Sequence, residues 1–220
     1  MKPIILLTSL TTILSVLLYI NPDLDIEISR IFYDEDSKSF PLRDHIISII
    51  LYKAIYVLAI GIGGICVLSL LLHFKNIEHK LLPSKRFLIF ILVALILGPG
   101  IVVHWGFKET FERARPVNIE EFGKTKIYTG PYVLSNQKGK SFISGHSSMG
   151  FFMTAFAFYF TGKRRKIAYA AGVSFGIISA SARVVQGAHF FSDVILSAII
   201  TLLIIHICHY FIFLKNKITD

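Results

Sequence analysis

Long apolar runs alternate with short polar clusters along the whole chain. Crossing the hydrocarbon core of a bilayer as a helix takes about 20 mostly apolar residues. The pattern therefore predicts helices that span a membrane, with polar connections at its two faces. Five runs approach the required length, namely Pro3–Ile20, Ile46–Leu72, Phe87–Val103, Ile167–Val185 and Val194–Leu214.

A sixth run, Ser148–Thr161, is shorter but almost wholly apolar. It must also cross, because the basic cluster after it belongs on the opposite side of the membrane from the polar loop before it. The first run is too long for the apolar core of a typical signal peptide and no small-residue cleavage site follows it, so we expect a retained helix. We predict an all-α polytopic membrane protein, a six-transmembrane-helix bundle in which residues 1–220 form one domain.

The composition agrees with this interpretation. Hydrophobic residues make up 54% of the 220 residues, and the mean hydropathy is +0.64, whereas a soluble domain has roughly 45–50% apolar residues even when glycine is counted. Cys66 and Cys208 both lie inside apolar runs. Their positions exclude a disulfide framework and a paired-cysteine metal site.

The formal net charge of +9 is typical of a protein that meets an anionic partner. Nucleic acid is not the expected partner, because the cations lie at membrane edges or in one polar loop and no recognition helix is visible. A cationic surface facing anionic lipid is the simpler account. We therefore expect the partners to be the bilayer and a membrane lipid.

The distribution of lysine and arginine predicts the orientation. With six spans, the basic residues of the short connections and the chain ends share one face, which we assign to the cytoplasm together with both termini. Of the 14 acidic residues, only Glu78 and Asp220 join them there. The opposite face carries residues 21–45, 104–147 and 186–192. The basic residues are Lys2, Lys75, Lys80, Lys85, Arg86, Lys163, Arg164, Arg165, Lys166, Lys215 and Lys217.

Three polar clusters lie at membrane edges on that opposite, outer face. The first follows the third span, the second begins the fourth, and the third lies at the turn between the last two spans. Each alone is weak, because a cation at a membrane edge is commonly an interface anchor and a histidine at a helix end is commonly structural. Together they indicate a functional site. The clusters are Lys108 to Arg115-Pro116, Ser144-Gly145-His146, and Arg183 with His189 and Asp193.

These residue types suit transfer of a phosphoryl group, which needs cations around its oxygens, a nucleophile in line and a proton for the leaving oxygen. Lys108, Arg115 and Arg183 supply cations, and Ser144-Gly145 supplies backbone N–H groups at a helix start.

The two histidines and the aspartate supply the remaining chemistry. His189 and Asp193 are four residues apart, so we expect them on one helical face, with the carboxylate bonded to one ring nitrogen and the other free to attack. We expect His146 to act as the general acid. For Arg113, phosphate binding and a plain surface charge both remain open. The lysines of the outer loop, Lys124, Lys126, Lys138 and Lys140, could likewise contact an anionic headgroup or simply face water.

At these residues the sequence resembles the type 2 phosphatidic acid phosphatase superfamily, whose pattern is K-x6-R-P, then P-S-G-H, then S-R-x5-H-x3-D. The resemblance implies a phosphohistidine at His189, an acid role for His146, and neither metal nor cofactor. It also implies phosphate binding by Lys108, Arg115, Ser144, Gly145 and Arg183. The sequence departs from the pattern at Ile143, where proline is usual, and at Ala182, where serine is usual.

Within the superfamily, several further segments resemble a bacterial branch that contains lipid A phosphatases, and they look most similar to the 4'-phosphatase type. This resemblance implies a phosphorylated lipid substrate in a bacterial inner membrane, with the site on the periplasmic face. The segments are Phe32-Tyr33-Asp34, Phe40 to Asp44, Gly98 to Val103, and Glu121-Phe122-Gly123.

Three alternatives remain open from the sequence. The same mechanism could serve undecaprenyl diphosphate or phosphatidylglycerol phosphate instead of lipid A. A metal enzyme could use His146, His189 and Asp193 as a two-histidine, one-carboxylate site, although the three cations would repel a metal ion. A transporter or channel would need polar groups through the bundle, whereas those of this chain lie at one edge.

Overall fold

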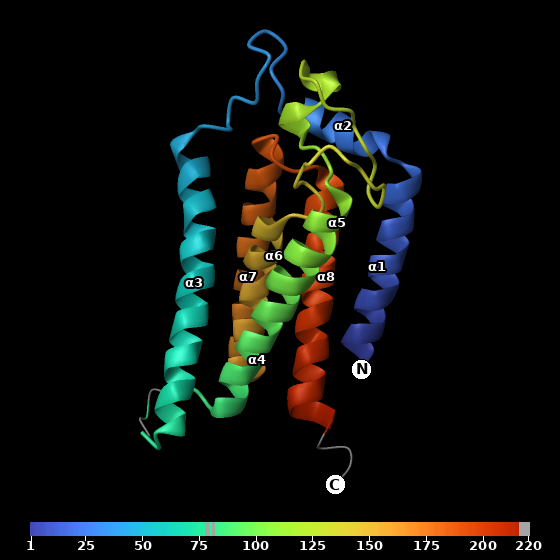
Figure 1. Cartoon of the computed structure of the whole chain (residues 1–220). Helices are drawn as coiled ribbons and strands as arrows, with labels where there is room; N and C mark the ends of the chain where they lie inside the picture. Colours follow the sequence, from blue (N-terminus) through green and yellow to red (C-terminus); the bar gives the residue numbers. More distant parts are fainter. Residues whose placement is uncertain (78–79, 81, 216–220) are drawn as a thin grey trace.

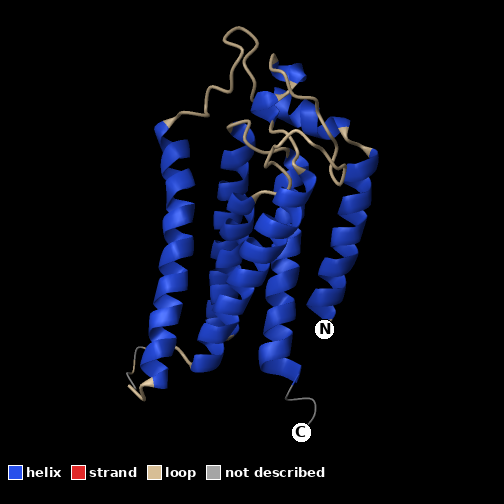
Figure 2. Ribbon diagram, viewed as in Figure 1, coloured by secondary structure: helices blue, strands red, loops and turns tan. Residues whose placement is uncertain are grey.

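The computed structural model describes residues 1–77, 80 and 82–215, so Glu78, Lys217 and Asp220 of the orientation argument lie outside the described residues. Over this part of the chain the fold is helical, without a strand and with two isolated bridges, Asp34 to Ser39 and Ile119 to Lys126 (Figure 2). The predicted all-α class is confirmed.

Five helices among the described residues are long and apolar enough to cross a membrane. The five long apolar runs are therefore confirmed as helices. Many large apolar side chains on their outer faces are exposed, such as Leu6 at 67% and Ile60 at 76%, as expected for surfaces that lipid would cover. The spans are α1 (Lys2–Ile20), α3 (Ile46–Phe74), Lys85–Asn118, α7 (Gly162–Val185) and Phe191–Leu214, which consists of α8 (Phe191–His209) and η5 (Tyr210–Leu214).

The third span is longer than the apolar run that predicted it. It comprises α4 (Lys85–Leu95), a π-helical segment η1 (Ile96–Lys108) and α5 (Glu109–Phe111). The expectation that Lys108 lies beyond the helix is therefore wrong, since Lys108 ends the π-helical segment. The expected kink at Gly98-Pro99-Gly100 falls inside this segment, whose wider turns accommodate a proline that lacks an N–H donor.

The short apolar run Ser148–Thr161, the fourth in chain order, falls mainly in α6 (Gly145–Phe152) and in the 3₁₀ segment that follows it, η4 (Met153–Tyr159). It is too short to count among the five spans, but almost every α6 side chain is buried. Gly150 and Gly176 bring α6 and α7 close together, because a Cβ on Gly150 would lie 2.8 Å from the Ser179 Cβ and one on Gly176 would lie 2.6 Å from the Phe151 ring. Small residues permit this approach.

The start of α1 and the end of η5 lie at one end of the bundle, and the long polar connections gather at the other (Figure 1). The latter end carries α2 (Asp23–Arg30), the loop of residues 31–45, and the segment of residues 112–144 with its two short turns η2 (Pro116–Asn118) and η3 (Glu120–Phe122). The apolar core below it joins α4, α6 and α8 through Phe90, Ile91, Phe152 and Ile205, all fully buried. The polar end thus rests on a rigid helical base.

Candidate active site

The structure brings the three polar clusters together at the loop-bearing end of the bundle. The Val117 N–H, next to Pro116, donates to the Gly187 carbonyl at 3.0 Å, which joins the first cluster to the third. The Ser144 N–H donates to the Asp193 carbonyl at 3.1 Å, which joins the second to the third. A Cβ on Gly145 would lie 3.3 Å from the Lys108 Nζ. Because Gly145 has no side chain, the Lys108 ammonium can lie close to the start of α6.

The second cluster is anchored by its serines. The Ser144 side chain caps α6 by accepting from the Ser147 N–H at 3.3 Å, and the Ser144 carbonyl accepts from the Ser197 hydroxyl of α8 at 2.6 Å. The Ser147 hydroxyl donates to the Val194 carbonyl at 2.9 Å. The first turn of α6 is therefore fixed against the first turns of α8, with Gly145 facing Lys108.

His189 does not lie on a helical face with Asp193, contrary to the expectation from their spacing. Helix α8 begins at Phe191 with Phe190 as its N-cap, so His189 precedes the helix. Its Nδ1 lies 2.8 Å from the Ser141 carbonyl and 3.5 Å from Asp193 Oδ2. A carbonyl only accepts, so Nδ1 carries the proton and the Nε2 lone pair is free.

The His189 ring is buried, with 1% of its side chain exposed. Burial lowers the pKa of His189 to about 3, the neighbouring Asp193 carboxylate opposes that shift, and the charge of Lys108 adds to it. The imidazole is therefore neutral at physiological pH, which is the protonation state of a nucleophile.

Asp193 is completely buried and has four partners. Its Oδ2 accepts from the Ser141 hydroxyl at 2.5 Å and from the Phe190 N–H at 2.9 Å, and it faces His189. Its Oδ1 accepts from Arg113 at 2.6 Å. The carboxylate thus caps α8 and holds the segment that carries the histidine.

Arg113 has neither of the roles left open for it. Only 1% of its side chain is exposed, and it pairs with Asp25 at 2.8 Å and with Asp193 at 2.6 Å. Its remaining donors reach the Ser192 hydroxyl at 2.9 Å, the Thr129 carbonyl at 2.6 Å and the Tyr128 hydroxyl at 3.2 Å. It is an internal cation behind the site, not a surface charge or a phosphate ligand.

A close backbone approach positions Arg113 and Ser141 together. The Gly139 N–H donates to the Glu112 carbonyl at 2.9 Å and the Ser141 N–H to the Arg113 carbonyl at 3.0 Å. A Cβ on Gly139 would collide with the Arg113 backbone, so only glycine allows these two segments to meet. This pairing carries the Ser141 carbonyl to His189.

His146 is held by an aromatic side chain that the sequence did not indicate. The ring of Tyr52, from α3, stacks on His146 with centroids 4.6 Å apart. The Arg183 guanidinium lies 5.1 Å from the centroid of the same Tyr52 ring. The His146 Nε2 is buried and has no hydrogen-bond partner within the described part of the chain. Burial, then the charges of Arg183 and Lys108, lower the pKa of His146 to about 3.

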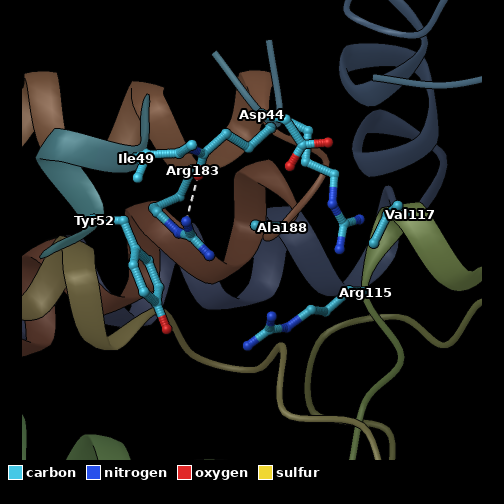
Figure 3. A pocket seen from close by; sticks show the side chains of 9 residues that line it. Asp44, Ile49, Tyr52, Arg115, Val117, Arg183 and Ala188 are labelled. Atoms are coloured by element: carbon cyan, nitrogen blue, oxygen red, sulfur yellow. Dashed lines mark hydrogen bonds between the residues drawn. The ribbon is translucent and has the colours of Figure 1, made fainter. Parts of the chain in front are cut away.

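A pocket of about 300 Å³ that several charged side chains line lies beside Tyr52. Arg115 and Arg183 reach into the same space next to Ala188 (Figure 3), and Gln186 accepts from Arg183. The Arg183 Nε is buried without a partner among the described residues. Arg43, from the loop before α3, also lines the pocket. It was missed because nothing in the sequence shows where that loop folds back. The pocket also contains one carboxylate, that of Asp44, so its charged lining keeps an excess of positive charge that would attract an anion.

A second, mostly apolar cavity of about 490 Å³ lies between α3 and η1. Side chains of Ile55, Ile60, Ile96 and Met149 line it, together with the backbone of Gly100. The polar residues at the same cavity are Lys108, His146 and His104. An apolar space thus adjoins the groups of the first and second clusters.

Two of the outer-loop lysines have protein partners. Lys140 pairs with Glu109 at 2.7 Å on the surface, and the Lys126 Nζ donates to the Gln137 carbonyl at 2.6 Å. Lys124 and Lys138 make no side-chain hydrogen bond or ion pair in the described residues. As for a metal site, the described residues contain no group of three or more His, Cys, Asp and Glu side chains arranged to hold an ion.

Comparison with known proteins gives two matches. The family model described as the PAP2 superfamily matches residues 87–217. The lipid A 4'-phosphatase of Francisella tularensis subsp. novicida (strain U112) is 39% identical over 139 residues, which cover 62% of this chain and 63% of that protein. The chain thus spans under two thirds of the length of this relative. No solved structure matches.

Proposed function

Because the chain belongs to the PAP2 superfamily, as its three motifs predicted, we propose that it is a membrane lipid phosphatase that works through a phosphohistidine at His189 without a metal ion. The observation that carries the proposal is the Nδ1–H bond of His189 to the Ser141 carbonyl at 2.8 Å. It leaves the Nε2 lone pair of a neutral imidazole free to attack, on a ring that feels the charges of Lys108 and Arg183.

In the first step, the His189 Nε2 attacks phosphorus and the bond between phosphorus and the lipid oxygen breaks. His146 takes a proton from the phosphate monoanion as the substrate binds, and it passes this proton to the leaving alkoxide. Lys108, Arg115 and Arg183 neutralise the phosphoryl oxygens, and the Gly145 N–H at the start of α6 binds one of them, because the Ser144 N–H already donates to the Asp193 carbonyl. The His146 Nε2 and the Arg183 Nε, which have no partner within the part of the chain that the structure describes, are polar atoms that a bound phosphate would satisfy.

In the second step, His146, now neutral, takes a proton from water, and the hydroxide attacks phosphorus. The bond between nitrogen and phosphorus breaks, and its electron pair returns to Nε2. Asp193 stabilises the charge of the phosphorylated imidazole through both steps. Inorganic phosphate then leaves and restores the neutral histidine.

The substrate we propose is lipid A, with removal of the 4' phosphate favoured over the 1 phosphate. The support is the resemblance of the outer-loop segments and the name of the relative, a lipid A 4'-phosphatase. The apolar cavity between α3 and η1 suits an acyl chain, and the pocket of Arg43, Arg115 and Arg183 suits a phosphorylated headgroup.

We further propose that residues 1–220 form a single domain. We also propose that the short run Ser148–Thr161 crosses the membrane in addition to the five long spans. The eight residues of α6 rise about 12 Å, and the seven residues of η4 rise about 14 Å because a 3₁₀ helix is more extended. Together they approach the roughly 30 Å of a hydrocarbon core. Their burial among the other helices explains how so short a segment is tolerated.

For orientation, we propose a bacterial inner membrane with both termini cytoplasmic and the site at the periplasmic edge. The support is the basic connection at Lys163 to Lys166, at the end of the bundle that carries both termini (Figure 1). The positive-inside rule assigns such an end to the cytoplasm.

The proposal is tested with the purified chain in mixed micelles of lipid A bearing ³²P at the 4' position. We expect wild-type protein to release labelled phosphate and to carry an alkali-stable label, whereas His189→Ala should lose both, a fall of at least about 10⁴-fold in rate. Lys124→Ala, an exposed change in the outer loop, serves as the control and should behave as wild type. Turnover by the His189 variant at the wild-type rate would contradict the mechanism.

The same assay separates the alternatives. Undecaprenyl diphosphate and phosphatidylglycerol phosphate are offered in parallel, and faster release from either would replace lipid A as the substrate. Full activity in EDTA is expected, and loss of activity that zinc or magnesium restores would favour a metal enzyme instead.

A further inference from the structure

A buried ion network links the N-terminal segment to the site. Asp25, on α2, is 2% exposed, and the side chains of Arg113 and Asp193 are 1% and 0% exposed. The guanidinium forks between them, with one nitrogen 2.8 Å from Asp25 and the other 2.6 Å from Asp193. Asp25 lies outside residues 87–217, the part that the family model matches.

Both carboxylate oxygens of Asp25 accept further hydrogen bonds. Its Oδ1 accepts from the Ser192 N–H at 2.8 Å, and its Oδ2 accepts from the Ser192 hydroxyl at 2.5 Å and from the Tyr128 hydroxyl at 3.2 Å. Ser192 is the neighbour of Asp193 in the first turn of α8. Helix α2 is therefore bonded directly to the turn that carries the carboxylate behind His189.

The charges of this network do not cancel. Two carboxylates share one guanidinium, so the cluster of Asp25, Arg113 and Asp193 carries one net negative charge. Were Asp25 absent, Arg113 alone would neutralise Asp193, and the carboxylate that faces His189 at 3.5 Å would lose its effect on the ring. In a site closed to water, such a difference in charge is felt strongly.

The charge matters because attack by Nε2 converts a neutral imidazole into a cation, since Nδ1 keeps its proton while Nε2 bonds to phosphorus. Hydrolysis of the phosphoryl group reverses this change. A buried negative charge therefore favours formation of the phosphohistidine and slows its breakdown.

We infer that Asp25 is a positioning residue for the reaction, which acts through Arg113 to keep Asp193 negative toward His189. The inference rests on the proposed function, because it assigns a role within the phosphohistidine mechanism. It also gives the N-terminal segment a part in the chemistry, although the family motifs lie elsewhere.

The test compares Asp25→Asn with Asp23→Asn, the same chemical change at an exposed residue of the same helix. Each full-length variant is mixed rapidly with lipid A labelled with ³²P at the 4' position and quenched in alkali, which preserves phosphohistidine. For Asp25→Asn we expect formation of the labelled enzyme to slow by about tenfold to a hundredfold and its breakdown to quicken, with KM unchanged. Asp23→Asn should match wild type.

A double variant separates charge from structure. Asp25→Asn combined with Arg113→Gln removes one charge of each sign and restores the net negative charge, so its labelled fraction should exceed that of Asp25→Asn alone. Rate constants are read only from enzyme that becomes labelled, so misfolded protein does not enter them.

Two outcomes would overturn the inference. Equal rate constants for Asp25→Asn and Asp23→Asn would remove Asp25 from the reaction, and a loss of labelled amplitude alone would leave it a purely structural role. The wild-type chain tests the proposed function separately. If it releases phosphate without becoming labelled, the proposed phosphohistidine intermediate is wrong. The ratio of the phosphate-release rates of Asp25→Asn and Asp23→Asn then still measures how much Asp25 contributes to the reaction.

Discussion

His146 has two unusual features for a general acid. Its Nε2 has no partner among the described residues, and its pKa lies near 3 because of burial and the nearby charges of Arg183, Lys108 and Arg115. The ring is therefore neutral in the free enzyme throughout the neutral pH range. The proton for the leaving oxygen must arrive with the substrate, as the monoanion of a phosphate whose own charge offsets the three cations.

This leads to a prediction for the pH profile. The second pKa of a phosphomonoester is about 6, so the proton-bearing monoanion becomes scarce above that pH. We expect kcat/KM for a phosphomonoester lipid to fall by up to about tenfold per unit as pH rises from about 7 to 9, measured in micelles of fixed composition. His146→Gln should be slow at every pH and lack this fall. A kcat/KM that rises between pH 6 and 8 would contradict the prediction.

At the scale of elements, the site depends on how closely α6 and α7 approach. The two helices meet at glycines, and the contact fixes His146 at one end of α6 relative to Arg183 near the end of α7. Glycine on α3 has a different setting, because a Cβ at Gly64 would meet nothing within 4 Å. The same residue type therefore serves close packing in one helix and merely faces outward in another.

Matched substitutions test this difference. Gly176→Ala should destabilise the protein by about 1–3 kcal/mol, since the new methyl would overlap the Phe151 ring and the tight contact has no room to relax. Gly64→Ala should be neutral or raise stability by up to about 1 kcal/mol through helix propensity. Thermal unfolding can be followed with a thiol-reactive dye, because Cys66 and Cys208 are buried in the folded chain. Equal midpoints for the two variants would refute the packing argument.

At the scale of the whole molecule, the fold places the short basic connections and the candidate site at opposite ends of the bundle. The bundle carries its termini at one end and the loops of the site at the other (Figure 1). Helices α2 and α3 and the loop between them, all outside the part matched by the family model, reach the site through Asp25, Arg43 and Tyr52. The family core and the N-terminal segment thus build one site together.

The proposed orientation predicts the pattern of surface labelling. In a background with Cys66 and Cys208 changed to serine, Lys124→Cys should react with a membrane-impermeant maleimide on spheroplasts, because the proposed orientation places the outer loop in the periplasm. Lys163→Cys should react only after lysis. Both positions are exposed in the folded protein, so a difference in reaction reports the side of the membrane. The reverse pattern would place the termini outside and contradict the proposed topology.

The sequence alone determined the helical class, the five long spans and the family, and it predicted the residues of the three polar clusters. The physical reason is that a bilayer demands long apolar runs, and that phosphoryl chemistry demands cations and histidines whose spacing is readable along the chain. The same local signals ended the third span too early and placed His189 on a helix, because neither a π-helical continuation nor an N-cap at Phe190 follows from hydropathy.

Only the tertiary structure decided what surrounds those residues. Arg113 reads as one more cation in a basic cluster, yet it is buried between Asp25 and Asp193, which are 168 positions apart in the printed numbering. Tyr52 lies in no motif, and Arg43 lies in the segment Phe40 to Asp44, whose resemblance assigned it no role; the folded chain brings both to the site. Contacts of this kind depend on how the helices pack and on the loop that Gly139 allows to close, and neither leaves a local pattern in the sequence.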